Sequence, residues 1–328
     1  MVLRLQLIGI SSLAFPALLF FSGCGSGEDE SLEPSKNTGA PSKSRSIEKG
    51  RYVFPDGSVY DGELVGRKPS GYGERKFVNE DLYVGQFREG RAHGQGTFRY
   101  KADGELDRYV GLWSSGKRHG YGSLYMSDGS IFVGQWVNDS MKHGEFRGVD
   151  GTILSGNWRG DSLERGKMRH SDGTTFTGIL DSEGHYLAGS LHAANGEHYI
   201  GSFQKGLYHG RGSLSRSSGV NYVGGFESGL FSGEGILEET GGKRYIGSFV
   251  AGEPDGLGQQ SDPSGVVYSG AWRRGLRHGM GSIGFADGTS YVGEFRDNLA
   301  YDGRYDWGNG RVTRSYQQQD GQWRDRSE

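Results

Sequence analysis

A Tyr-x-Gly-x-aromatic motif recurs along this chain at a nearly constant spacing, and this period limits the possible folds more than any other feature. Five consecutive copies each begin 23 residues after the one before, at Tyr199, Tyr222, Tyr245, Tyr268 and Tyr291. A fixed period of this length indicates that one supersecondary unit is copied along the chain. With the other copies there are about twelve units, which begin at Tyr60, Tyr83, Tyr109, Phe132, Leu154, Phe176 and Gln319.

Each unit holds two further short elements. A His-Gly-x-Gly sequence, as at His93, Gly94 and Gly96, lies about eleven residues after the tyrosine. An Asp-Gly or Asn-Gly pair, as at Asp56-Gly57, closes the unit. Such a pair favours a tight hairpin turn in which both central residues take positive φ. The unit therefore predicts a strand, a loop, a second strand and a tight turn.

Residue spacing within the motif indicates β-strands. Positions i, i+2 and i+4 share one face of a strand, so Tyr83 and Phe87 flank the gap left by Gly85. We expect an aromatic ring from a neighbouring strand to cover that glycine. Links this short allow only antiparallel neighbours. Helices are excluded because glycine, with 61 residues of 328, interrupts every helical window.

The sequence from Tyr83 to Gly96 resembles the MORN repeat, written Y-x-G-x-[WF]-x-x-G-x-x-H-G-x-G. The resemblance implies an all-β fold, an elongated and twisted antiparallel meander of about twelve hairpins in an open single-layer sheet over residues 51–328. The copies over 154–189 depart from the pattern, which leaves a bend or simple drift open there. The resemblance assigns structural roles to Tyr83, Gly85, Phe87, His93, Gly94, Gly96, Tyr109, Gly111, Trp113, Tyr199, Gly201, Tyr222, Gly224, Tyr245, Gly247, Tyr268, Gly270, Trp272, Tyr291 and Gly293.

The N-terminal segment differs from the repeats. Residues 1–23 combine one early charge, Arg4, with a short apolar run, which is typical of a secretory signal peptide. The sequence from Phe21 to Cys24 resembles a bacterial lipobox, although leucine is usual where Phe21 stands. We expect lipidation at Cys24; the alternative is a chance cysteine at the end of an ordinary signal. Residues 24–50, poor in apolar side chains, predict a disordered tether.

Side chains that suggest chemistry have simpler explanations in the repeat. Equivalent positions two strands apart lie about 10 Å from each other, too far for zinc ligands. We therefore expect a turn role for the repeated histidines, and no metal, cofactor or catalytic residue. The basic residues of the hairpin loops are expected to be solvated rather than bound to lipid phosphates. The histidines are His93, His119, His143, His209 and His278, and the basic residues are Lys117, Arg118, Arg273, Arg274 and Arg277.

These observations predict a non-enzymatic scaffold or protein-interaction repeat protein, exported and anchored by lipid in a bacterial envelope, with an unidentified protein partner. Binding to a cell-wall glycan or to acidic phospholipid is the alternative. The net charge of −3 gives no indication of nucleic-acid binding. The family's repeats also occur fused to phosphatidylinositol phosphate kinases and lysine methyltransferases. The repeats here leave no room for either catalytic domain.

Overall fold

The computed structural model describes residues 46–101 and 104–326, and every regular element among them is a β-strand. Within those ranges no helix has the length and apolar character that crossing a membrane requires. The strands fall into two compact units, divided between Val149 and Asp150.

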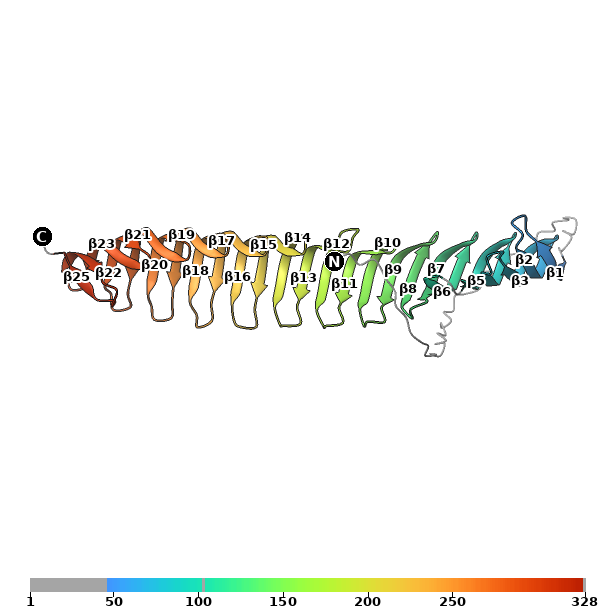
Figure 1. Ribbon diagram of the computed structural model, residues 1–328, viewed down its shortest axis with the longest axis horizontal. Helices are drawn as coiled ribbons and strands as arrows, with labels where there is room; N and C mark the ends of the chain where they lie inside the picture. Colours follow the sequence, from blue (N-terminus) through green and yellow to red (C-terminus); the bar gives the residue numbers. More distant parts are fainter. Residues whose placement is uncertain (1–45, 102–103, 327–328) are drawn as a thin grey trace, which may run out of the picture. The chain divides into compact units, whose positions relative to one another are not determined.

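The first unit is a run of hairpins in which each strand pairs with the next along the chain (Figure 1). Its strands are β1 (Ile47–Val53), β2 (Val59–Val65), β3 (Lys68–Lys76), β4 (Leu82–Arg88), β5 (Arg91–Arg99), β6 (Leu106–Ser114), β7 (Lys117–Met126), β8 (Ile131–Val137) and β9 (Ser140–Arg147).

The second unit continues the same hairpin pattern. Its strands are β10 (Ile153–Arg159), β11 (Ser162–Arg169), β12 (Thr175–Leu180), β13 (Tyr186–His192), β14 (His198–Gln204), β15 (Leu207–Ser215), β16 (Asn221–Glu227), β17 (Leu230–Glu238), β18 (Arg244–Val250), β19 (Glu253–Ser261), β20 (Val267–Arg273), β21 (Leu276–Gly284), β22 (Ser290–Arg296), β23 (Leu299–Asp306), β24 (Val312–Gln317) and β25 (Trp323–Asp325).

Pairing between consecutive strands is antiparallel throughout both units, so the predicted all-β meander is confirmed. The sheet does not close on itself: among the described strands, β1 pairs with β2 alone and β25 with β24 alone. Short links between strands explain this topology, because they leave no length for a crossover.

The first strand begins earlier than the sequence indicated. β1 starts at Ile47, inside the segment predicted as a tether to residue 50, because its backbone pairs with β2 from Ile47↔Val65 to Val53↔Val59. Residues 1–45 lie outside the described part of the chain. They hold the predicted signal peptide, Cys24 and most of the predicted tether.

Two kinds of turn alternate along the chain. The two positive φ values predicted for the Asp-Gly turn occur instead at the other turn. At the Asp-Gly pair only Gly57 takes a positive φ, +83°, because the Asp56 carboxylate accepts the Ser58 N–H at 3.0 Å and shapes a type I turn with a bulge. The predicted turn with two positive φ values occurs at the other link of the hairpin. There Glu89 has φ 53° and Gly90 has φ 80°.

The His-Gly element lies at a bulge within the second strand, not at a turn as predicted. Between the pairs Gly85↔Gly96 and Phe87↔Ala92, residues 93–95 of β5 stand opposite one residue of β4, Gln86. Gly94 takes φ 65° there. The Gln86 side chain accepts the Gln95 N–H at 3.0 Å. The bulge bends the hairpin at its glycine pair.

Each repeat tyrosine lies flat on a pair of glycines from two neighbouring strands. A Cβ atom added to Gly96 would lie 2.2 Å from the Tyr83 hydroxyl, and one added to Gly85 would lie 2.9 Å from the same atom. Tyr83 Oη donates a hydrogen bond to the backbone carbonyl of Gln86 at 2.9 Å. The ring is 1% exposed. The aromatic that covers Gly96 thus comes from the neighbouring strand, as expected, while Gly85 is covered from its own strand.

The second aromatic of each repeat connects one tyrosine to the next. Phe87 meets Tyr83 edge-on at 5.0 Å and the preceding tyrosine, Tyr60, at 4.7 Å. Trp113 meets Tyr109 at 5.3 Å and Tyr83 at 5.2 Å in the same way. Edge-to-face pairs of this kind add about 0.5–1.5 kcal/mol each beyond burial. A single aromatic layer therefore forms the core of each unit.

The divergent copies over 154–189 keep the sheet. The glycine pairs Gly156↔Gly166 and Gly178↔Gly189 are retained, and Phe176 fills the tyrosine position with no exposed surface. From Leu154 to Phe176 the spacing is 22 residues, and the bulge of β11 is correspondingly shorter: Glu164 alone is extra there. This repeat therefore lacks the His and the second Gly of the motif because its bulge is one residue shorter.

Two glycines of one strand test the contact between tyrosine and glycine. In β21, a Cβ atom at Gly281 would lie 2.6 Å from the Tyr268 hydroxyl, whereas one at Gly284 would meet no atom within 4 Å. Gly281→Ala should lower the free energy of unfolding by about 1–3 kcal/mol, the usual range for an overpacked core. Gly284→Ala is the matched control and should change it little. Urea unfolding followed by circular dichroism measures both; equal effects would contradict this account.

Burial of the tyrosines makes the fold sensitive to alkali. Desolvation is the largest cause and raises the pKa to about 12 for Tyr60, Tyr109, Tyr222, Tyr245, Tyr268 and Tyr291. The folded pKa lies above the unfolded value of about 10, so this contribution to stability is complete below pH 10 and is lost as the pH rises through about 12. Absorbance at 295 nm and circular dichroism should change together in that window. Ionisation of these residues near pH 10 in a chain that stays folded would contradict the burial argument.

Candidate binding site on the aromatic face

One position varies from hairpin to hairpin above this constant layer. It is the residue just after the hairpin turn that pairs with the last position of the motif, which is aromatic in most repeats, and we call it the cover position. Tyr208 occupies it opposite Phe203, and Ala92 occupies it opposite Phe87. In chain order the cover positions of the described hairpins are Pro69, Ala92, Arg118, Met141, Leu163, Tyr186, Tyr208, Phe231, Pro254, Arg277, Ala300 and Trp323.

Aromatic residues at the cover position stack on the repeat aromatic. Tyr208 lies 3.8 Å from Tyr199 with an interplanar angle of 15°, and Phe231 lies 3.8 Å from Tyr222 at 13°. Tyr186 stacks on Phe176 at 3.9 Å. These three neighbouring hairpins therefore carry a second aromatic layer over the first.

Arginines at the cover position do the same through cation–π contacts. The guanidinium carbon of Arg118 lies 4.3 Å from the ring centre of Trp136, and that of Arg277 lies 5.0 Å from Tyr268. Arg118 also forms an ion pair with Asp139 at 3.3 Å. The prediction that both are solvated loop charges is wrong, because their guanidinium groups lie over aromatic rings and both residues are partly buried. Lys117, Arg273 and Arg274 are exposed.

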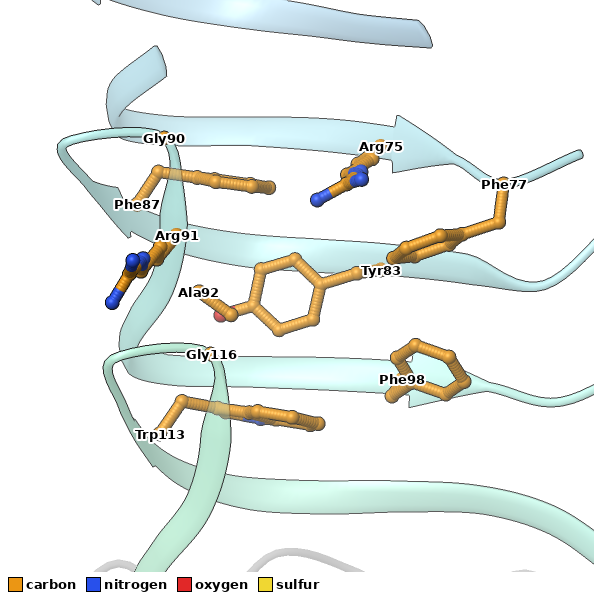
Figure 2. A pocket seen from close by; sticks show the side chains of 10 residues that line it. All are labelled: Arg75, Phe77, Tyr83, Phe87, Gly90, Arg91, Ala92, Phe98, Trp113 and Gly116. Atoms are coloured by element: carbon orange, nitrogen blue, oxygen red, sulfur yellow. The ribbon is translucent and has the colours of Figure 1, made fainter. Parts of the chain in front are cut away.

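Ala92 is too short to cover its repeat, and a hollow of about 160 Å³ remains, which we call the Ala92 hollow (Figure 2). Figure 2 shows the rings of Phe87 and Trp113 on either side of Tyr83. The complete lining is Arg75, Phe77, Tyr83, Phe87, Gly90, Arg91, Ala92, Phe98, Trp113 and Gly116. The hollow is thus an aromatic surface with two arginines.

The two arginines of the hollow differ in their partners. Arg75 donates to Asp56 at 2.7 Å and to Ser58 Oγ at 2.8 Å. Its guanidinium also lies 3.7 Å from the Phe54 ring centre, and desolvation lowers the pKa of this half-buried side chain. The pKa of Asp56 is lowered by its hydrogen bonds with Ser58 and by Arg75. Arg91, by contrast, is exposed and makes no ion pair with any described residue.

Five of the residues singled out in the sequence lie at or beneath the hollow. Tyr83, Phe87 and Trp113 form the floor of the hollow, while Gly94 and Gly96 bend the strand beneath it. Ala92, Arg75 and Phe77 also line the hollow and were not identified from the sequence. Comparing the cover position across repeats shows Ala92 as a small residue in a column of mostly large ones, and this signal was present in the sequence.

The repeated histidines are separated along the bulges. His209 and His278 each have a buried Nδ1 atom without a hydrogen-bond partner, and that of His278 lies 3.5 Å from the Asp297 carboxylate. In the described ranges, no three His, Asp or Glu side chains are grouped so as to hold a metal ion. The geometry therefore points to packing at the bulge for these two side chains.

A family model described as MORN repeat matches the chain at residues 49–59, 83–104, 109–131, 199–220, 222–238, 245–267 and 268–290. The chain is therefore similar to this family over seven stretches, and the unmatched stretch from 132 to 198 includes the divergent copies. Rat alsin is 35% identical over 99 residues, and human alsin is 34% identical over 99 residues. Each match covers 28% of this chain and 6% of alsin, so the chain spans a small part of these relatives.

Among solved structures, the chain is similar to the TCP domain of Drosophila melanogaster SAS-4, solved in complex with a proline-rich motif of Ana2. That match has a TM-score of 0.30 and 13% identity, over 52% of this chain and 86% of the other. A streptogramin B lyase gives a TM-score of 0.14 and 12% identity, over 85% of this chain and 86% of the other. Neither likeness is close enough to carry an argument about fold or function.

Filling the hollow from within tests this description. Ala92→Tyr should place a ring on Tyr83 as Tyr208 does on Tyr199, and raise the free energy of unfolding by about 1 kcal/mol. The converse variant Tyr208→Ala should lower the free energy of unfolding by about 2 kcal/mol. This is less than the loss expected on truncating a fully buried aromatic residue, because Tyr208 is half-buried. Urea unfolding measures both. Destabilisation by Ala92→Tyr would show that no space exists above Tyr83.

Proposed function

We propose that this chain of MORN repeats is a scaffold of the bacterial cell envelope, attached through a lipid on Cys24, that binds another protein on its aromatic face. The observation that carries the binding role is the variable cover position over a constant layer. A binding surface requires a rigid framework whose exposed positions differ, and here the glycine–tyrosine framework repeats while the covering residue changes.

A scaffold role is also supported by the structural contacts that the motif residues make within the sheet. In repeats that begin with tyrosine, the hydroxyl is engaged in the sheet because it donates to a backbone carbonyl, as Tyr83 does to Gln86 and Tyr268 to Ala271. The family matches fall on the repeats alone. We therefore place the function in binding and position rather than in catalysis.

Envelope attachment is proposed from the sequence. Cys24 is the only cysteine of the chain, and it follows a charged start and a short apolar run. One acyl chain alone gives only marginal membrane binding, so stable anchoring takes a second chain or another membrane signal beside it. The scaffold would then be held at a membrane with its repeats free to contact a partner.

The alternative functions receive less support. Phospholipid binding was considered for the loop arginines, but Arg118 and Arg277 lie on aromatic rings. Glycan binding favours rows of exposed aromatics, whereas the repeat tyrosines are buried. We retain the protein partner as the proposed ligand.

Substitution at the cysteine tests the anchor. In cells grown with radiolabelled palmitate, the wild-type chain should take up label and sediment with membranes, and Cys24→Ala should do neither. Ser26→Ala, two residues away, is the matched control and should behave as wild type. An unlabelled wild-type chain, or membrane sedimentation of Cys24→Ala equal to wild type, would contradict lipid attachment. Cross-linking in the same cells tests the scaffold: recovery of no specific partner would count against it.

A further inference from the structure

We propose that the Ala92 hollow is the part of the scaffold that receives the partner, and that its ligand is an aromatic side chain flanked by Asp or Glu in an exposed peptide segment. This rests on the proposed scaffold function. It goes further by naming the site and the chemistry of the group that binds there.

Another repeat of the chain offers a comparison with the Ala92 hollow. The repeat that begins at Tyr291 also has alanine at the cover position, Ala300, opposite Phe295. There the indole of Trp323 packs against Tyr291 at 5.1 Å, Tyr305 at 4.4 Å and Phe285 at 6.4 Å. An aromatic ring thus packs on the rings of this repeat.

The rings that Trp323 contacts have counterparts in the Ala92 hollow. By position in the repeat, Tyr291 corresponds to Tyr83, Tyr305 to Phe98 and Phe285 to Phe77. One difference separates the two places. Gln317 stands at the register position of Trp113, so Trp323 also takes over the contacts that Trp113 makes with Tyr83 and Phe98. Around Ala92 those contacts are already made and the remaining space is empty.

The size of the hollow suits a single ring. Its volume is about 160 Å³, and an apolar cavity of about 150 Å³ accommodates benzene. Tyr83, Phe87 and Trp113 would contact such a ring, and aromatic pairs favour edge-to-face or offset arrangements. An aromatic anchor in a concave aromatic site is also the usual centre of a protein interface.

The charge of the side chains that line the hollow indicates which residues should flank the aromatic ring of the ligand. Two arginines and no carboxylate line the hollow. Arg75 is held by Asp56, but the exposed guanidinium of Arg91 has no ion-pair partner among the described residues. A neighbouring Asp or Glu of the ligand would pair with Arg91, while a cationic ligand would be repelled.

The backbone around the hollow is already satisfied, so the ligand binds through its side chain. Gly116 N donates to the Ala92 carbonyl at 2.9 Å, and Gly90 N donates to the Pro69 carbonyl at 2.8 Å. These bonds hold the turns of successive hairpins together. A peptide strand therefore cannot add to the sheet here, in contrast to β-augmentation at a free edge.

Three fluorescein-labelled peptides test the proposal against the full chain: Gly-Glu-Asp-Trp-Glu-Asp-Gly, the same peptide with alanine for tryptophan, and the same peptide with lysines for its acidic residues. Fluorescence anisotropy should detect saturable binding of the first, at least about tenfold tighter than of the other two. Equal binding of the alanine peptide would overturn the aromatic anchor. No binding of the first peptide at millimolar concentration would overturn the proposal.

Variants of the chain locate the binding. Ala92→Tyr should weaken binding of the tryptophan peptide at least about tenfold, whereas Ala194→Tyr, which adds a tyrosine at an exposed turn, should leave it unchanged. Arg91→Glu, an exposed substitution that keeps the aromatic layer, should weaken binding of the acidic peptide severalfold and strengthen binding of the lysine peptide. Unchanged binding by Ala92→Tyr would overturn the proposal, as would an Arg91→Glu variant without altered charge preference.

Two further measurements separate this proposal from the scaffold function. If cross-linking in cells recovers the same partner with Ala92→Tyr as with the wild-type chain, the scaffold function is supported and the proposed binding site at Ala92 is wrong. If sedimentation shows that the chain self-associates, and Ala92→Tyr abolishes this, the occupant is a second copy and the proposed partner is wrong.

Discussion

The contact of a tyrosine ring with two glycines is the interaction on which the rest of this structure depends. A ring can lie flat on a sheet only where two adjacent strands both lack a Cβ atom, as at Gly85 and Gly96. Once there, its hydroxyl reaches a backbone carbonyl three residues on and fixes the bend of the hairpin. The neighbouring aromatic then covers the ring from one side and the next repeat covers it from the other. This explains how a chain with 33% hydrophobic residues builds a core.

The sequence predicted the parts of the fold that depend on residue type at fixed spacing. Strands, antiparallel order, glycine positions and aromatic faces follow from the Tyr-x-Gly-x-aromatic motif. Register was harder, because Asp56-Gly57 is compatible with more than one turn and only the Asp56 hydrogen bond to Ser58 selects the observed one. The bulge at His93 and Gly94 was likewise missed. Its existence depends on which residues stand opposite each other, and local composition carries no such information.

The candidate site depends on differences between repeats rather than on their consensus. A motif search averages over copies and so removes the signal of Ala92. Arg118 and Arg277 were read as loop charges because the sequence does not show that their guanidinium groups lie over aromatic rings. Both errors have one origin: the cover position belongs to no motif, although its side chain decides whether each ring is stacked, charged or open.

The hairpin order has a mechanical consequence. Every neighbour in this meander is also the next segment along the chain, and consecutive strands are held by rows of backbone hydrogen bonds across the sheet. A force applied to one end of such a unit loads the outermost row first, so hairpins would open one at a time, like a zipper. Each opened repeat of 23 residues would release about 80 Å of extended chain. A scaffold of this kind would lengthen in steps under tension, while the repeats that are still folded would keep their binding surface.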